Sequence, residues 1–261
     1  MSFIFGTLLG LLAIRLSLVF LHQSIDIYFD DVAMVMVFGG TLAIGIISAP
    51  WHNHREIWRM IVALFFKRNP KHTRVIEAGL QFVQEPHQEQ QHRLGKRSLA
   101  AQTLRDGQEL LSLNFTTQDL EIILQERIHQ ALEKQRQVAE FFQSLAKYPP
   151  AFGLVGTVLG LVNLMRAMTD GMDPSQTGIK MALALVATLY GLIVANFLVA
   201  PVAEAMHKRI QLEQFHADIA LQAVLLASDR VSLLKSQELL NSYIDQGERI
   251  NVISRLLKEA A

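Results

Sequence analysis

The sequence predicts an all-α membrane protein with four transmembrane helices in two hairpins, a helical cytoplasmic domain and a helical C-terminal tail. The first observation is a mean hydropathy of +0.25 in a chain that is 51% hydrophobic and 18% charged, which is typical of apolar spans joined to aqueous parts. The second is a set of four apolar stretches, each of about the 20 residues that a helix needs to cross a bilayer. The third is the helical spacing of apolar residues in the polar parts of the chain.

The apolar stretches define the predicted domains. The 261 residues divide into a first hairpin over 1–50, a cytoplasmic domain over 51–148, a second hairpin over 149–205 and a tail over 206–261. The first span has neither the basic residues nor the cleavage site of a signal peptide, so we expect it to remain as an anchor. The four predicted spans are, roughly, Phe3–Leu21, Val32–Pro50, Pro150–Met168 and Met181–Ala203.

The basic residues predict the orientation. Of the 24 Lys and Arg residues, 14 lie between His52 and Lys147 and seven follow Met206. Under the positive-inside rule the middle block, the tail and both termini are cytoplasmic. The first external loop is acidic, with Asp26, Asp30 and Asp31. The formal net charge of zero gives no overall field that favours nucleic acid as a partner.

Amphipathic helices are predicted in both cytoplasmic parts. A capping pattern, Thr116 with Asp119, precedes a long stretch that we expect to run directly into the third span. Similar stretches around IQLEQFHADIALQAVLLA and SQELLNSYI occur in the tail. We interpret both as surfaces for helix packing rather than as sites. The apolar positions of the long stretch are Leu120, Leu124, Ile128, Leu132, Val138, Phe142 and Leu145.

Small residues form a stripe on each of the last two spans. In the third span, one face is small and faintly polar and the opposite face is apolar; the fourth span repeats the pattern. Spacing of four residues permits close approach of two helix backbones. Alternatively, the stripes line a narrow path for an ion. The stripes comprise Gly153, Gly156 and Gly160 on the third span, and Ala184, Ala187, Gly191 and Ala195 on the fourth.

Two hydroxyls, those of Thr157 and Thr188, lie on these stripes and could ligand a cation or order water. Counted from Pro150 and Pro201, Thr157 lies about 10 Å into the membrane and Thr188 about 20 Å. The two hydroxyls therefore meet only if the helix ends are offset. The two prolines mark either helix boundaries or kinks, or else hinges between membrane and cytoplasm.

No Asp, Glu or His lies near the middle of any predicted span. A proton relay normally needs an ionisable group, so a partner helix must supply the carboxylate if ions move here. Arg15 lies within the first span, where it could snorkel to the membrane interface, pair with a lipid phosphate or pair with another chain. The chain has no cysteine, no phosphate-binding loop and no zinc signature, and nothing predicts an enzyme, a cofactor or a metal site.

These segments resemble the MotA/PomA stator subunits of the bacterial flagellar motor, within the MotA/TolQ/ExbB superfamily. The likeness is carried by PPAFGLVGTVLGLV, ALVATLYG and VAPVAE in the second hairpin and by VFGGTLAIGIISAP in the first. It is specific over residues 149–206, moderate over 1–50 and weak elsewhere. The layout of two hairpins around a cytoplasmic insertion is also that of this family, whereas TolQ and ExbB have one span before the insertion.

The resemblance implies a ring-forming subunit, a homopentamer in the inner membrane, that uses H⁺ or Na⁺ flow to turn the flagellar rotor ring and so drive motility. It implies a MotB/PomB-like partner with a single span that carries the membrane aspartate and a domain that binds peptidoglycan. Thr157 and Thr188 match hydroxyl positions on the ion path, and Pro150 and Pro201 match two prolines implicated in conformational coupling. The small-residue stripes would face the partner helices, with lipid around the ring.

The sequence leaves the load and the ion open. A cytoplasmic stretch by which relatives contact the rotor is not found, so no rotor-contacting residue is predicted. The alternatives are the same machine with another load, such as outer-membrane energisation or gliding, and a membrane scaffold that conducts no ion. Sodium-driven and proton-driven relatives both have a threonine at the position of Thr157. Ala187 stands where sodium-driven relatives can have a further hydroxyl.

Overall fold

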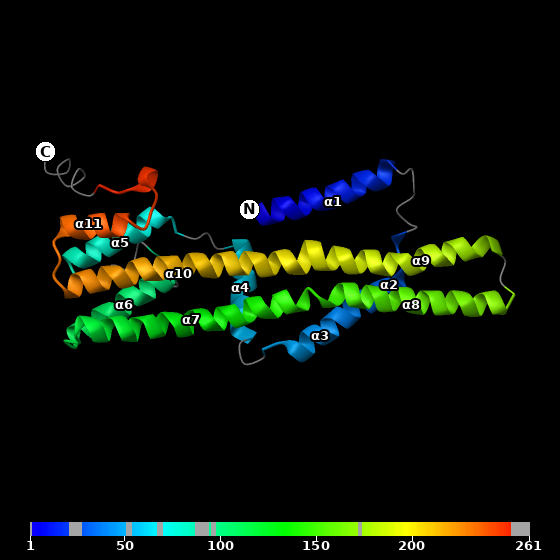
Figure 1. The fold of residues 1–261 in the computed structure, drawn as a ribbon, viewed down its shortest axis with the longest axis horizontal. Coiled ribbons are helices and arrows are strands. Elements are labelled where there is room, and N and C mark those ends of the chain that lie inside the picture. The colour runs from blue at the N-terminus through cyan, green and yellow to red at the C-terminus, as the bar shows by residue number, and fades with distance from the viewer. Residues whose placement is uncertain are drawn as a thin grey trace. The chain divides into compact units, whose positions relative to one another are not determined.

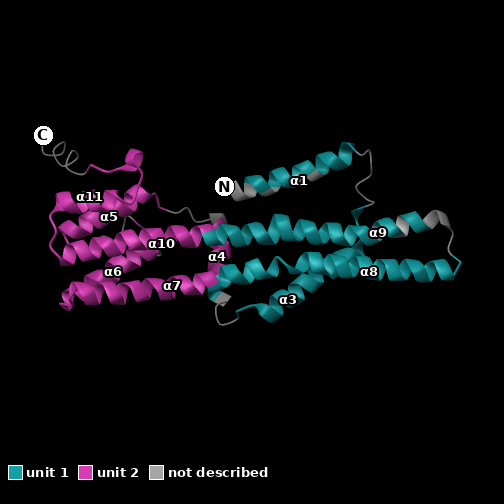
Figure 2. Cartoon of the chain, viewed as in Figure 1, with its two compact units in different colours: residues 1–57, 137–207 teal, residues 58–136, 208–261 magenta. Residues whose placement is uncertain are grey.

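The computed structural model describes residues 2–20, 28–50, 54–66, 70–86, 94, 98–171 and 174–251. These residues are helical almost throughout and include no strand, as Figure 1 shows, which confirms the predicted all-α class. The chain forms two compact units, drawn in two colours in Figure 2. Unit 1 consists of Met1–Ile57 and Gln137–His207, and unit 2 consists of Trp58–Arg136 and Lys208–Ala261.

Unit 1 holds all the predicted spans. Its second span is a continuous helical run in which a π-helical segment separates two α-helices, and its fourth span contains another π-helical segment. Its helices are α1 (Ser2–Phe20), α2 (Asp31–Met34), η2 (Val35–Gly39), α3 (Gly40–Ser48), α8 (Tyr148–Thr169), α9 (Pro174–Ile193) and η4 (Val194–Val199).

Three helical runs among the described residues are long and apolar enough to cross a membrane: Asp31–Ser48, Thr117–Thr169 and Ala184–Ser228. The two longer runs have 53 and 45 residues. A helix needs about 20 residues to cross the hydrocarbon of a bilayer, so part of each run lies outside it. In α1 the apolar stretch is shorter, Leu8–Phe20, so three of the four predicted spans are confirmed by length and composition.

In unit 1, helices α8 and α9 form an antiparallel pair, and α8 also contacts η2 and α3. Gly171, just after α8, has a φ of 85°, a left-handed conformation that glycine adopts without steric cost and that suits the turn toward α9. The side of α8 opposite its small residues is exposed, as expected of a surface that faces lipid or another membrane helix. It includes Leu154, Val155, Val158, Leu161, Val162 and Met165.

Unit 2 is a helical bundle. It contains most of α4 (His54–Phe66), with α5 (His72–Gln84), α6 (Leu99–Ser112), α11 (Leu233–Asn241) and η5 (Gln246–Glu248). It also contains the larger parts of α7 (Thr117–Leu145) and α10 (Ala200–Ser228). Its core confirms the predicted periodicity of α7, because the side chains of Leu120, Leu124, Ile128 and Leu132 are all buried. Val138, in the part of α7 that belongs to unit 1, is buried as well. Gly79 of α5 and Gly107 of α6 admit α10, whose Ala223 and Val224 occupy the space of the missing side chains.

The start of α7 has the predicted cap. The Thr116 Oγ1 accepts a hydrogen bond from the backbone N–H of Asp119 at 3.2 Å and donates to the Asp119 carboxylate at 2.6 Å. The expected direct passage into the third span is confirmed to within two residues: the run Thr117–Thr169 has a turn between Leu145, where α7 ends, and Tyr148, where α8 begins. Pro149 and Pro150 have no N–H to donate to the carbonyls four residues earlier, so a two-residue turn separates the helices.

Candidate functional site

The two predicted hydroxyls meet between α8 and α9. The Thr157 Oγ1 lies 2.5 Å from the Thr188 Oγ1 and 3.1 Å from the carbonyl oxygens of Gly153 and Ala184. The Thr188 hydroxyl is also 3.4 Å from the Gly153 carbonyl. Both threonines are half-buried. Four oxygen atoms from two helices thus form one cluster, which we call the oxygen cluster.

The meeting depends on a large offset between the helix ends. A Cβ added to Gly191 would lie 2.5 Å from the Pro149 carbonyl oxygen and 2.9 Å from the Pro150 Cα. Pro150 is therefore level with Gly191, and Pro201 lies ten residues farther along the chain. The mismatch of about 10 Å expected between the hydroxyls assumed that the two prolines lie at the same depth. That assumption is wrong. The hydroxyls are level.

The oxygen cluster has spare capacity to bind. Each threonine hydroxyl carries one hydrogen and two acceptor lone pairs, and each carbonyl oxygen has two lone pairs. Each carbonyl also accepts the backbone N–H four residues later in its own helix. When Thr188 donates to Thr157 and Thr157 donates to one carbonyl, about half of the lone pairs of the four oxygens have no donor. A set of neutral oxygens suits a hard cation or a water molecule that carries a proton.

The small-residue stripes pack against each other around this cluster. A Cβ added to Gly153 would lie 2.8 Å from the Ala187 carbonyl oxygen, and one added to Gly156 would lie 2.7 Å from the Ala187 Cβ. A Cβ on Gly160 would lie 2.6 Å from the Ala184 Cβ. These distances are too short for any side chain larger than hydrogen. The stripes therefore make the close α8–α9 contact that positions the hydroxyls, with Ala195 buried in η4.

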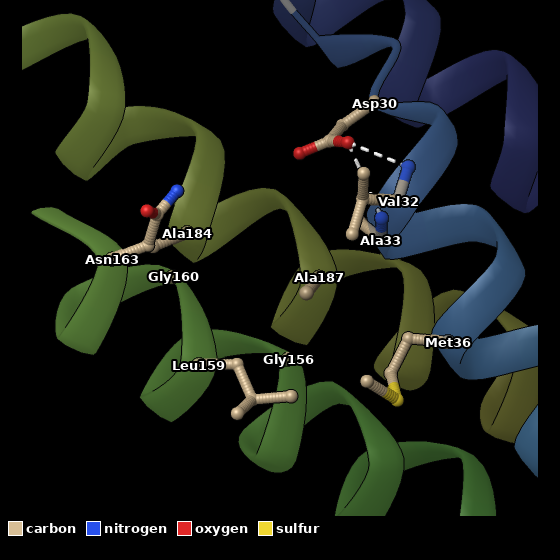
Figure 3. Close-up of a pocket in the computed structure, with 10 residues that line it drawn as sticks. All are labelled: Asp30, Val32, Ala33, Met36, Gly156, Leu159, Gly160, Asn163, Ala184 and Ala187. Carbon is tan, nitrogen blue, oxygen red and sulfur yellow. Dashed lines mark hydrogen bonds between the residues drawn. The ribbon is translucent and has the colours of Figure 1, made fainter.

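A pocket of about 310 Å³ opens beside the same contact. Figure 3 shows the Asp30 carboxylate and the Asn163 amide at this pocket, among apolar and small side chains. Asp30 caps α2, because its Oδ1 accepts hydrogen bonds from the N–H groups of Val32 at 2.8 Å and Ala33 at 3.3 Å. The pocket is lined by Asp30, Val32, Ala33, Met36, Gly156, Leu159, Gly160, Asn163, Ala184 and Ala187.

Sequence reasoning noted Asp30 only as part of an acidic loop and missed its place at this pocket. The signal was available in part, because an Asp directly before an apolar helix is a typical N-cap. The Tyr190 hydroxyl holds the loop in place: it donates to the Tyr28 carbonyl and accepts a hydrogen bond from the Asp30 N–H at 3.4 Å. This connection between distant residues has no signature in the sequence.

The two prolines have different settings. Pro150 lies in the first turn of α8, where a missing N–H costs little. Pro201 lies two residues after the end of η4, in a helical run that continues to Ser228, so it does not end the helix. The N–H of Ala200 donates to the carbonyl of Ala195, five residues back, which is the π-helical pattern. Such segments are frequent at functional sites.

Charged residues are absent from the oxygen cluster. Arg15 and Glu204 are both exposed, on α1 and near the start of α10. Among the described residues, no three His, Asp or Glu side chains come close enough to hold a metal ion. The arrangement supplies oxygen ligands without a fixed charge.

Unit 2 has two polar clusters that the sequence did not reveal. Glu213 of α10 accepts a hydrogen bond from the Gln135 amide at 3.1 Å and forms an ion pair with Arg209 at 3.4 Å. His72 of α5 and His216 of α10 share a hydrogen bond of 3.2 Å between their rings. Burial, aided by His72 and opposed by Glu213, lowers the pKa of His216 from 6.5 to about 4.

The chain is similar in sequence to a protein family and to proteins with known names. A family model described as the MotA/TolQ/ExbB proton channel family matches residues 72–218. A motility protein A of Aquifex aeolicus is 28% identical over 226 residues, which cover 84% of this chain and 88% of that protein. The chemotaxis protein PomA of Vibrio alginolyticus is 31% identical over 117 residues, 45% of each chain.

Two solved structures share the fold along almost the whole chain. The C. jejuni MotAB structure matches with a TM-score of 0.82 at 15% identity, covering 96% of this chain and 98% of that one. The flagellar MotAB stator complex from Bacillus subtilis matches with a TM-score of 0.80 at 19% identity, covering 95% and 98%.

Proposed function

This chain belongs to the MotA/TolQ/ExbB proton channel family, and from that premise we propose that it is the ring-forming subunit of an ion-driven flagellar motor stator. In this proposal the subunit converts the flow of H⁺ or Na⁺ through the bacterial inner membrane into torque on the rotor. Its similarity to a motility protein A over 84% of the chain, and to PomA over 45%, supports the flagellar role.

The observation that carries the proposal is the oxygen cluster of Thr157 and Thr188. It places hydroxyl and carbonyl oxygens between two membrane helices, yet it contains no ionisable group. Moving a proton through a membrane normally requires such a group. The missing carboxylate therefore belongs to a partner, and the chain supplies the neutral oxygens past which the ion moves.

The partner in this proposal is a MotB/PomB-like subunit with one span, a membrane aspartate and a domain that binds peptidoglycan. The matched structures are MotAB complexes, which supports a partner of this kind. We place five copies in a ring around two partner helices, with the α8–α9 pair next to those helices; the small-residue stripes, expected to face the partner, instead pack against each other within this pair. The hairpins, 1–50 and 149–205, lie in the membrane, and residues 51–148 and 206–261 with both termini lie in the cytoplasm.

The pocket at Asp30 suits the outer mouth of the ion path. It shares Ala184 with the oxygen cluster, and Gly156 and Ala187 precede the two threonines in the chain. A carboxylate at the mouth attracts cations from the external medium. We therefore infer entry at Asp30 and passage along the α8–α9 face, with Pro201 and η4 as the hinge that passes the movement to α10.

Substitution of Thr188 tests this function. Thr188→Ala removes one hydroxyl, and we expect swimming to fail while the protein stays in the membrane at its normal level. Thr188→Ser restores the hydroxyl and should restore swimming in part. The control is Thr169→Ala, because the Thr169 hydroxyl donates only to the Arg166 carbonyl of its own helix at 2.6 Å. If the Thr188→Ala strain swims normally, the oxygen cluster is not part of the ion path.

The coupling ion is tested on the same strains. Oxygen ligands suit Na⁺ as well as a proton carried by water, so the cluster is compatible with both. Swimming speed in media of constant ionic strength, with Na⁺ replaced by K⁺, distinguishes the two. A speed that falls with Na⁺ indicates sodium coupling, and a speed that does not change indicates protons.

A second candidate is the same machine with a different load. The matching family model also covers TolQ and ExbB, and no stretch for rotor contact is found in the sequence. Deletion of the gene separates the two candidates: loss of swimming with normal nutrient uptake supports the flagellar load, and the reverse supports outer-membrane energisation. Normal swimming and uptake, with no one-span partner encoded beside the gene, would favour a scaffold.

A further inference from the structure

A second pocket, of about 500 Å³, lies within unit 1 between α1 and the helices of the later spans. It shares no residue with the oxygen cluster or with the pocket at Asp30. We call it the α1 pocket. Its walls come from α1, from the two residues before Asp30, from α2 and η2, and from α9 and η4. It is lined by Ser17, Leu18, Tyr28, Phe29, Met34, Phe38, Leu189, Tyr190, Ile193, Val194 and Leu198.

Contacts within unit 1 build the α1 pocket. Helix α1 contacts η4, and a Cβ added to Gly10 would overlap the ring of Phe197, so glycine admits that ring. Ser17 lies seven residues, or about 10 Å, farther along α1. On the opposite wall the Tyr190 hydroxyl donates to the Tyr28 carbonyl and so holds the chain before α2 against α9. The space between these two contacts is therefore part of the packed fold.

The walls of the α1 pocket suit hydrocarbon better than water. The Ser17 hydroxyl already donates to the Ala13 carbonyl of its own helix at 3.0 Å. The Tyr190 hydroxyl donates to the Tyr28 carbonyl and accepts from the Asp30 N–H, so neither group has a hydrogen left for water. Apart from the Tyr28 hydroxyl, the remaining side chains of the pocket are aliphatic, aromatic or thioether groups. A buried water needs two to four polar partners, whereas an empty pocket costs its lining dispersion contacts.

The α1 pocket has the dimensions of one acyl chain. Along α9 and η4 it extends from Leu189 to Leu198, about 13 Å, which is close to half of the roughly 30 Å hydrocarbon core of a bilayer. Over that length a volume of about 500 Å³ gives a width of about 7 Å, less than the about 10–12 Å of a helix with its side chains. A cavity of about 150 Å³ holds one benzene ring, so this pocket has room for about 20 carbon atoms. A lipid tail fits it, and a helix of another subunit does not.

The charge at the end of the pocket where α2 begins favours one class of headgroup. The segment from His22 to Asp31 contains three Asp and neither Lys nor Arg. Asp31 is exposed and lies two residues after Phe29, which lines the pocket. A carboxylate there attracts the ammonium group of a zwitterionic headgroup and repels a headgroup with net negative charge.

We propose that the α1 pocket binds one acyl chain of phosphatidylethanolamine from the outer leaflet, with the headgroup beside Asp31. The proposal rests on the proposed function in one respect, the external location of the segment before α2. The tail fills the space between α1 and α9, and its contacts replace those that the side chains around an empty pocket lack. Since lipid tails are as apolar as the pocket, the preference for this lipid comes from its shape and its headgroup.

Photolabelling locates the lipid. The full chain, purified with its partner, is placed in phosphatidylcholine nanodiscs that contain a small fraction of phosphatidylethanolamine or phosphatidylglycerol with a diazirine on one acyl chain. After irradiation, mass spectrometry of peptides identifies the labelled residues. We expect labels to concentrate at Met34, Phe38 and Ile193. Phosphatidylethanolamine should label them up to about fivefold more than phosphatidylglycerol, the effect of an exposed ion pair.

Variants separate the pocket from the lipid that surrounds any membrane protein. Ser17→Phe places a ring in the pocket that needs about 150 Å³, almost a third of its volume, and should reduce labelling of Met34 and Ile193 severalfold. The matched control is Val19→Phe, because Val19 is on the same helix, is 60% exposed and does not line the pocket. It should leave the labelling unchanged. Asp31→Asn should remove the preference for phosphatidylethanolamine and leave labelling of the pocket by both lipids.

Three results would overturn the proposal. If Met34 and Ile193 are labelled no more than Leu9 and Leu12, which are exposed elsewhere on α1, the lipid is not bound in the pocket. If only the latter two are labelled, a side chain of another subunit fills the pocket. Equal labelling by the two lipids would refute the role of the headgroup.

The variant Thr188→Ala distinguishes this proposal from the proposed function. It should abolish swimming and leave labelling of the α1 pocket unchanged, since the pocket shares no residue with the oxygen cluster. Normal swimming of Thr188→Ala would contradict the proposed function and leave the photolabelling result to decide the lipid site by itself.

Discussion

The glycine stripe of α8 allows a test of the close helix contact by a single methyl group. In Gly153→Ala the new Cβ would lie 2.8 Å from the Ala187 carbonyl oxygen and 3.0 Å from the Thr188 Cα. Both are backbone atoms, which cannot rotate away as a side chain can. Ordinary contacts require about 3.5–4 Å between carbon atoms. The two helices must therefore separate by roughly half an ångström or more beside the oxygen cluster.

The control for this substitution is Gly39→Ala, because a Cβ at Gly39 meets nothing within 4 Å. Both changes raise helix propensity by up to about 1 kcal/mol, so the comparison removes that contribution. Overpacking of a close contact costs about 1–3 kcal/mol. With a shift of about 2–4 °C per kcal/mol, the melting temperature of Gly153→Ala should lie about 2–12 °C below that of Gly39→Ala.

The assay is thermal unfolding of each purified complex in detergent, followed by swimming of strains that carry each variant. We expect Gly153→Ala to melt earlier and swim poorly, since separation of the helices also stretches the contact of 2.5 Å between Thr157 and Thr188. Gly39→Ala should match the parent in both measurements. If the two variants melt together and swim equally, the register of α8 against α9 described above is wrong.

Two further predictions concern unit 2. Because the pKa of His216 is lowered from 6.5 to about 4, the unfolded chain takes up a proton that the folded chain rejects, so stability should fall as pH falls from 6.5 to 4. Urea unfolding of the full chain across this range should show it, and a slope that His216→Leu does not reduce would contradict it. Glu213→Ala removes the acceptor that Gln135 and Arg209 share and should cost about 2–3 kcal/mol in the same assay. The control Glu126→Ala, whose partner Gln130 is exposed, should cost less than about 0.5 kcal/mol; equal losses would show that the Glu213 cluster adds no stability.

The sequence by itself determined which segments are helical, which are apolar enough for a membrane and which faces carry small residues. Helical periodicity and mean hydropathy depend on neighbours within about one or two turns, so they can be read without the fold. The cap at Thr116 and the buried face of α7 follow from such local patterns. The small-residue stripes of α8 and α9 follow in the same way, although the sequence left open what they would contact.

The tertiary structure alone decided the register of α8 against α9. That register depends on which glycine fits against which alanine across helices about thirty residues apart in the chain, as at Gly160 and Ala184. It sets Pro150 beside Gly191, brings two hydroxyls with different predicted depths to 2.5 Å, and opens a pocket beside Asp30. Local patterns carry no such information, because side-chain shape is matched only when the two surfaces meet.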